Sequence, residues 1–193
     1  TTNFALGYIL SNVNLNFLWL SSLGYIINWY GDSLDGSLAR YRKQQRPFYG
    51  FYLDHTVDAI NETIMFTGAG LSVMMHQFPL ALMVLVVYLM MTLNVSMNAH
   101  LKGEFKLTYV KIGPTELRII MILANTLLVC IPSLAAYATP CHIFGKELSF
   151  GVFDILASIL FVGLAVVYII TVISDARSYA KIDPLPKNDS EKE

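Results

Sequence analysis

Long apolar stretches separated by short polar connections dominate the chain. Four stretches contain no Asp, Glu, Lys or Arg, and they cover residues 1–31, 63–101, 119–145 and 155–174. A helix needs about 20 mostly apolar residues to cross a bilayer. The second stretch is too long for one crossing, and a polar cluster at residues 11–16 interrupts the first. Both stretches are therefore expected to divide into two helical parts.

These breaks define the predicted elements. We expect a short helix over residues 1–10 and spanning helices near residues 15–40, 50–75, 79–101, 114–137 and 150–176. His76, Gln77 and Pro79 mark the turn inside the second stretch. The opening helix is too short to cross alone, and because no Met precedes it we expect it to be truncated. The prediction is an all-α, polytopic integral-membrane bundle of about six transmembrane helices.

Residues 1–176 form this predicted transmembrane domain, and residues 177–193 are expected to form a flexible cytoplasmic tail, since they combine two prolines with mixed charge. The composition agrees with a membrane location. Of 193 residues, 55% are hydrophobic and 14% are charged, whereas soluble domains have about 25% charged residues. The net charge of −1 gives no reason to expect a nucleic-acid partner. Cys130 and Cys141 lack the number and spacing of a disulfide framework or a metal site.

The basic residues fall on one predicted side of the membrane. Twelve of the thirteen lie in alternate connections or in the tail, namely Arg40, Arg42, Lys43, Arg46, Lys102, Lys106, Lys111, Arg118, Arg177, Lys181, Lys187 and Lys192. Only Lys146 falls in the other connections. The positive-inside rule assigns the richly basic side to the cytoplasm. Lys102, Lys106 and Lys111 are expected to meet anionic lipid headgroups there.

Four aspartates occupy the predicted cytoplasmic ends of two consecutive spans. Asp32 and Asp35 are three residues apart, and Asp54 and Asp58 are four apart, so each pair shares a helix face. The connection over residues 41–49 turns the chain back and brings the pairs together. Ionisable groups at membrane depth are costly and mark functional sites. Crowded carboxylates repel unless cations neutralise them, and oxygen-only ligands favour Mg²⁺, Mn²⁺ or Ca²⁺ over zinc.

A structural alternative is an ion-pair network between these aspartates and the neighbouring bases Arg40, Arg42, Lys43 and Arg46. We favour the metal site, because the acids lie along inward-facing helix stripes and the bases lie mostly in the connection.

Small residues follow the acids along the chain. Gly36, Ala39 and Gly50 permit close approach of a ligand or a second helix to the backbone. Arg40, one turn after the first acidic pair, has the guanidinium geometry to clamp phosphate oxygens, and its alternative role is to anchor the helix end at the membrane surface.

Together these residues resemble the signature DxxDGxxAR(x9)GxxxDxxxD of the CDP-alcohol phosphotransferase family. All eight positions match, and they are Asp32, Asp35, Gly36, Ala39, Arg40, Gly50, Asp54 and Asp58. The resemblance implies an integral-membrane enzyme, typically of six spans and often a homodimer, that joins a CDP-linked donor to an alcohol and releases CMP. It implies that the four aspartates hold two divalent ions, Mg²⁺ or Mn²⁺. It further implies a nucleotide site lined by Gly36, Ala39, Arg40 and Gly50, with Asp58 as the catalytic base.

The segment LDHTVDAIN, from Leu53 to Asn61, resembles the DHxxDxxN segment of choline and ethanolamine phosphotransferases. In those enzymes the histidine has a catalytic role, which His55 would take here; a structural role is its alternative. They carry a glutamate where this chain has Phe51. The likeness favours CDP-choline or CDP-ethanolamine as donor and diacylglycerol as acceptor. The alternative is CDP-diacylglycerol with a small polar alcohol such as inositol phosphate, glycerol phosphate or serine.

Further polar residues near the same end are candidates either for binding the acceptor or for hydrogen bonds between helices, and they are Asn61, Glu62, Asn94, Asn98, His100, Glu116 and Arg118. Asp154, at the start of the last span, is expected to be stabilised by the helix dipole. A transporter of ions or metabolites is a remote alternative function. The acids cluster at one surface and the sequence shows no internal repeat, and both features disfavour a transporter.

Overall fold

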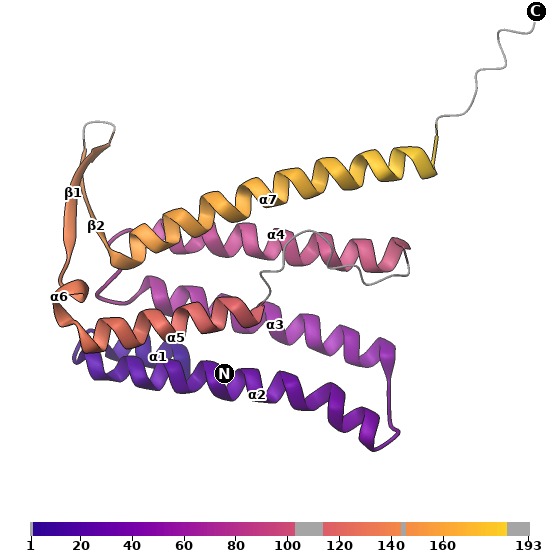
Figure 1. Ribbon diagram of the computed structural model, residues 1–193, viewed down its shortest axis with the longest axis horizontal. Helices are drawn as coiled ribbons and strands as arrows, with labels where there is room; N and C mark the ends of the chain where they lie inside the picture. The colour runs from indigo at the N-terminus through magenta and orange to yellow at the C-terminus, as the bar shows by residue number, and fades with distance from the viewer. Residues whose placement is uncertain (1, 103–113, 144–145, 185–193) are drawn as a thin grey trace, which may run out of the picture.

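The computed structural model describes residues 2–102, 114–143 and 146–184, and it is predominantly helical (Figure 1). In chain order its elements are α1 (Asn3–Leu10), the 3₁₀ helix η1 (Leu15–Phe17), α2 (Leu18–Tyr41), α3 (Pro47–Gly70), α4 (Phe78–Lys102), α5 (Pro114–Cys130), α6 (Pro132–Ala135), β1 (Ala138–Ile143), β2 (Lys146–Gly151) and α7 (Val152–Ile182). Each helix predicted from the apolar stretches has a counterpart in the structure, and the bounds differ most at the ends of α5 and α7.

The long helices lie side by side in one bundle (Figure 1). Helix α7 packs on α4, α4 on α3, and α5 on α2, while the short α1 contacts both α2 and α3. At one end of the bundle α2, α4 and α7 end and α3 begins, and we call this the site end. The opposite end carries the β1–β2 hairpin, and we call it the hairpin end.

Within the described part of the chain, two helices are long and apolar enough to cross a membrane, by length and composition: Phe78–Leu101 in α4 and Val152–Ile182 in α7. Their most apolar windows are 17% and 0% buried inside the protein. Apolar side chains that are not covered by protein suit a lipid environment. In α5 the apolar part, Leu117–Cys130, is shorter than the usual span. The helical class is confirmed, whereas six spans and their orientation stay predictions.

A buried polar network joins three helices near the hairpin end. The Tyr8 hydroxyl, on α1, lies 3.2 Å from the Tyr25 hydroxyl of α2 and donates to Oδ1 of Asn125 on α5 at 3.2 Å. The Asn125 amide donates to the Ser22 hydroxyl at 3.3 Å. Buried polar groups are costly unless they are paired. The network therefore favours one register of α1, α2 and α5.

Glycines let α1 approach its neighbours closely. A Cβ on Gly24 of α2 would lie 2.7 Å from the backbone nitrogen of Phe4, and one on Gly68 of α3 would lie 2.6 Å from the Cα of Ala5. Such distances exclude any side chain without a backbone shift. Small residues at helix contacts are a common packing device in membranes. They fix α1 in the half of the bundle near the hairpin end.

A tight helix end turns the chain between α2 and α3. The N–H of Gln44 donates to the carbonyl of Ala39, and the N–H of Lys43 donates to the carbonyl of Arg40, both at 3.1 Å. Lys43 has a φ of 53°. This pattern is the Schellman motif, in which a left-handed residue closes the helix. Pro47 then starts α3 at a position where its missing N–H costs nothing.

The hairpin was not predicted from the sequence. Strands β1 and β2 pair antiparallel from Ala138↔Gly151 to Ile143↔Lys146, within a segment expected to link two helices. Helix α5 also ends earlier than predicted, at Cys130, because Pro132 has no N–H and disfavours helical conformation in the residue before it. Pro140 weakened the strand signal, since proline is unusual within a strand.

The last helix is longer than predicted. Helix α7 continues to Ile182, six residues into the segment that the sequence assigned to a flexible tail. Arg177, Ala180 and Lys181 are good helix formers, and Pro184 disfavours further helix. The expected tail beyond residue 184, and Lys106 and Lys111 with their expected contacts to headgroups, lie outside the described residues.

Candidate active site between α2, α3 and α5

Three of the four predicted aspartates come together at the site end. Asp32 projects from α2, and Asp54 and Asp58 project from α3 one turn apart. The carboxyl group of Asp58 lies within electrostatic range of both Asp32 and Asp54. Asp35 lies on α2 as predicted, and its side chain is outside the described part of the structure. The turn after α2 thus allows acids from two helices to share one region.

Arg118 of α5 lies among these acids. Its Nη2 donates a hydrogen bond to Oδ2 of Asp32 in an ion pair, with the side chains 12% and 33% exposed, respectively. Arg118 also interacts electrostatically with Asp58 and Glu62. The alternative to a metal site in the sequence analysis was an ion-pair network between the aspartates and the basic residues around the α2–α3 connection. Among the described side chains, Asp32 pairs instead with an arginine 86 residues along the chain.

Glu62 extends the acidic stripe of α3 by one turn beyond Asp58. Its Oε2 atom is buried and has no hydrogen-bond partner in the described part of the chain. Glu62 lies within electrostatic range of Asp58, Arg118 and Tyr88. A buried acceptor without a partner costs about 1–3 kcal/mol. This oxygen therefore has an unused capacity to bind a donor close to the acids.

The predicted nucleotide-binding residues leave the backbone accessible. A Cβ on Gly50 would meet nothing within 4 Å, and a Cβ on Gly36 would meet only the guanidinium of Arg40, with Nη1 at 3.6 Å. Nη2 of Arg40 donates to the Ser37 hydroxyl at 3.3 Å, and the Arg40 side chain is exposed. Ala39 is half-buried one turn after Gly36. A phosphate-bearing ligand can thus reach both glycines and Arg40.

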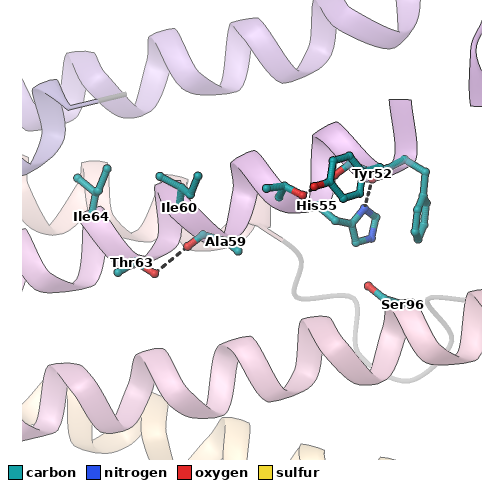
Figure 2. A pocket seen from close by; sticks show the side chains of 9 residues that line it. Tyr52, His55, Ala59, Ile60, Thr63, Ile64 and Ser96 are labelled. Carbon is teal, nitrogen blue, oxygen red and sulfur yellow. Dashed lines mark hydrogen bonds between the residues drawn. The ribbon is translucent and has the colours of Figure 1, made fainter. Parts of the chain in front are cut away.

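His55 lies on the side of α3 that faces α4, across from Ser96 (Figure 2). Its Nδ1 hydrogen-bonds the Phe51 carbonyl at 3.0 Å, and its ring packs on the Phe51 ring with centroids 4.1 Å apart. The same nitrogen lies 3.9 Å from Oδ2 of Asp54. His55 therefore lies beside the acids, on the adjoining face of α3 that is turned toward α4.

That adjoining face forms one wall of an open groove of about 700 Å³, shown in Figure 2. The groove is mostly apolar, and it is lined by Phe51, Tyr52, His55, Thr56, Ala59, Ile60, Thr63, Ile64 and Ser96. It follows α3 for more than three turns, beginning beside His55. The sequence did not reveal it, because a groove between two helices depends on how α3 packs on α4.

Asn94 and Asn98 of α4 bind α7 through hydrogen bonds. Their amides donate to Oδ2 of Asp175 at 3.2 and 2.8 Å, and the Tyr179 hydroxyl donates to Oδ1 of Asn98 at 2.7 Å. The sequence left these asparagines open between binding the acceptor and packing, and the geometry favours packing. His100 is exposed near the end of the same helix. Sequence reasoning missed Asp175 and Tyr179, although an aspartate directly after the apolar stretch of the last span was a usable signal.

The acids fit a hard divalent cation by donor type, since carboxylate oxygens are the ligands that Mg²⁺ and Mn²⁺ prefer. Arg118 shows that the region already takes a positive group. Among the described side chains, no three His, Cys, Asp or Glu groups converge tightly enough to hold a metal ion. Asp35 is outside that set. The two-ion site stays a prediction based on donor chemistry and on the signature. The Glu116 side chain, a candidate for the acceptor, also lies outside the described part.

A comparison with protein families agrees with the signature. Residues 4–173 match the family model described as CDP-alcohol phosphatidyltransferase. The chain therefore belongs to the CDP-alcohol phosphatidyltransferase family, whose members are transferases of substituted phosphate groups in membrane phospholipid synthesis. No curated protein and no solved structure matched the chain with significant similarity.

Proposed function

We propose that this chain transfers a phosphoalcohol group from CDP-choline or CDP-ethanolamine to diacylglycerol, and releases CMP, at the cytoplasmic surface of the membrane. The observation that carries the proposal is that Asp58 of α3 lies within electrostatic range of Asp32 of α2 and of Asp54, in a chain of this family. The choice of donor is supported by the sequence around His55. CDP-diacylglycerol with a small polar alcohol is the competing pair within the same chemistry. The family resemblance also favours a homodimer.

The roles of the side chains follow from their positions. Arg40, above the open backbone of Gly36, binds diphosphate oxygens of the donor, and Gly50 admits the nucleotide on the α3 side. The acceptor hydroxyl attacks the β-phosphorus, a new P–O bond forms, and the bond from that phosphorus to the bridging oxygen breaks, so that CMP leaves. Asp58 accepts the hydroxyl proton. Two divalent ions, when bound to the aspartates, supply charge neutralisation for the diphosphate.

The groove along α3 supplies a place for the lipid substrate. Its lining is mostly apolar, and it lies along α3, a helix that we place in the membrane. Its first residues, Phe51 and His55, adjoin Asp54. An acyl chain lying there would hold the glycerol hydroxyl near the acids, which favours reaction by positioning. Apolar contact along several helical turns supports affinity for long chains.

The direct test measures CMP release by the purified chain in detergent with Mg²⁺. We expect release with CDP-choline or CDP-ethanolamine when diacylglycerol is present, and none without an acceptor. Release with CDP-diacylglycerol and a small polar alcohol, in place of these pairs, would reassign the donor and acceptor. If no pair among the CDP-alcohols and acceptors released CMP, the enzyme proposal would be rejected.

Asp58→Asn tests the assignment of the base. We expect turnover to fall by about 10²–10⁴-fold, the usual contribution of a general base, while affinity for the CDP-alcohol stays within about threefold. Asp183→Asn is the matched control, because Asp183 is exposed at the end of α7 and far along the chain from the acids. Nearly normal turnover in Asp58→Asn would remove Asp58 from the role.

A further inference from the structure

Arg118 lies where divalent ions are expected to bind. It forms an ion pair with Asp32 and interacts with Asp58 and Glu62, and its own side chain is only 12% exposed. Buried arginines are retained where their charge has a partner. In the described structure that partner is Asp32, a residue that the family signature assigns to the metal ligands.

The Asp32 carboxylate cannot bind the Arg118 guanidinium and a divalent ion equally well at the same time. The guanidinium donates to Oδ2 of Asp32, and a divalent ion would use lone pairs of the same carboxylate. A divalent ion and a guanidinium on one carboxyl group also repel each other strongly in a partly buried site. Binding of the metal therefore requires Arg118 to move away from Asp32.

Glu62 provides the place to which Arg118 can move. Its Oε2 is buried without a hydrogen-bond partner in the described residues, and Arg118 is already within electrostatic range. Arginine and carboxylate form charge-assisted hydrogen bonds with matching geometry. A shift from Asp32 to Glu62 would pair this oxygen and would free Asp32 for the metal.

We infer that Arg118 is the resident counter-ion of the acidic centre, which holds Asp32 in the metal-free protein and moves to Glu62 when a divalent ion binds. This inference rests on the proposed function, because it assumes that Asp32 is a metal ligand. Arg118 is thus a positioning residue that keeps mutually repelling acids together until the ions arrive.

The test measures Mn²⁺ affinity of the purified full-length chain in detergent, by the electron paramagnetic resonance signal of free Mn²⁺ and without substrate. Removal of the competing charge in Arg118→Gln is expected to tighten binding by about tenfold, as for the loss of one charged hydrogen bond. Glu62→Gln removes the alternative partner, so it should weaken binding by a similar factor. Arg177→Gln, on α7, is the matched control and should stay within about twofold of the unaltered chain.

The double variant distinguishes exchange from simple electrostatics. If Arg118 moves to Glu62, the weakening by Glu62→Gln disappears in the Arg118→Gln background. Equal weakening in both backgrounds, or unchanged affinity in Arg118→Gln, would overturn the inference. Arg118→Lys, which keeps the charge, serves if Arg118→Gln does not fold, and it should tighten Mn²⁺ binding by a smaller factor, with unchanged affinity again overturning the inference.

The outcome is separable from that of the proposed function. Coupled Mn²⁺ affinities without CMP release would retain the exchange and reject the transferase. CMP release with uncoupled Mn²⁺ affinities would retain the transferase and reject the exchange.

Discussion

Asp154 is a single side chain that holds two connections together. Its carboxylate accepts hydrogen bonds from the backbone N–H groups of His76 and Gln77, between α3 and α4, and of Gly151, before α7, all at 2.7–2.8 Å. The side chain is completely buried. The sequence predicted a favourable interaction with the helix dipole, whereas the structure adds specific bonds across 78 residues of sequence.

Asp154→Ala is therefore expected to destabilise the protein. Three backbone donors would lose a charged acceptor in a buried position, and we expect a loss of about 3–5 kcal/mol in the free energy of unfolding. The measurement is unfolding of the purified chain in detergent mixtures. Asp183→Ala removes an exposed aspartate and should change stability by less than about 0.5 kcal/mol. Equal effects of the two variants would contradict the role of Asp154.

At the residue scale, the sequence predicts relations between neighbours in one helix but not contacts between distant residues. Spacing alone placed Asp54 and Asp58 on one face of a helix, because helical periodicity relates near neighbours. The pairing of Arg118 with Asp32 depends on how α5 packs on α2. Helical spacing does not relate residues that are so far apart in the chain, so this ion pair could not be predicted. The burial of the Glu62 oxygen also depends on packing and could not be predicted from the sequence.

Among the elements, α3 carries two different features on adjoining faces. One face carries Asp54, Asp58 and Glu62, and the other lines the groove with Ala59 and Thr63. The helix itself was predicted from the pattern of apolar and polar residues. The division of its faces was not, because it depends on the neighbouring α4. The β1–β2 hairpin was missed for a different reason. Its strands are short, and β1 contains Pro140, which is unusual within a strand.

Filling the groove should affect the lipid substrate selectively. We expect Ala59→Phe to lower kcat/KM for long-chain diacylglycerol by about tenfold, as loss of contact with one or two methylene groups would, while affinity for the CDP-alcohol is unchanged. Val57→Phe is the matched control, because Val57 is exposed on the same helix and outside the groove lining. Similar losses in both variants would argue against an acyl chain in this groove.

At the scale of the whole molecule, the sequence predicts that the site end of the bundle faces the cytoplasm and the hairpin end faces the opposite side of the membrane. The apolar surfaces of α4 and α7 support a membrane location. Which end faces the cytoplasm was predicted from the distribution of basic residues, and this orientation depends on the membrane and not on internal packing. Gln44, at the site end, and Cys141, in the hairpin, are both exposed and suit a labelling experiment.

In cells with intact membranes, an impermeant maleimide should label Cys141 in a Cys130→Ser background. Gln44→Cys, in a chain without the two native cysteines, should be labelled only after permeabilisation. Mass spectrometry of the purified chain measures both. The positive-inside rule is the physical reason for this expectation. Labelling of Gln44→Cys before permeabilisation, with Cys141 protected, would reverse the orientation.

The short α1 gives the bundle an uneven interior. Its tight contacts at Gly24 and Gly68, and the hydroxyl network around Tyr8, lie toward the hairpin, whereas the segments that carry the aspartates are largely exposed. At the site end α2 and α3 are joined by the short connection over residues 42–46, and the tight packing of the fold lies elsewhere. We therefore expect a bulky headgroup to reach the exposed site end without disturbing the contacts around α1.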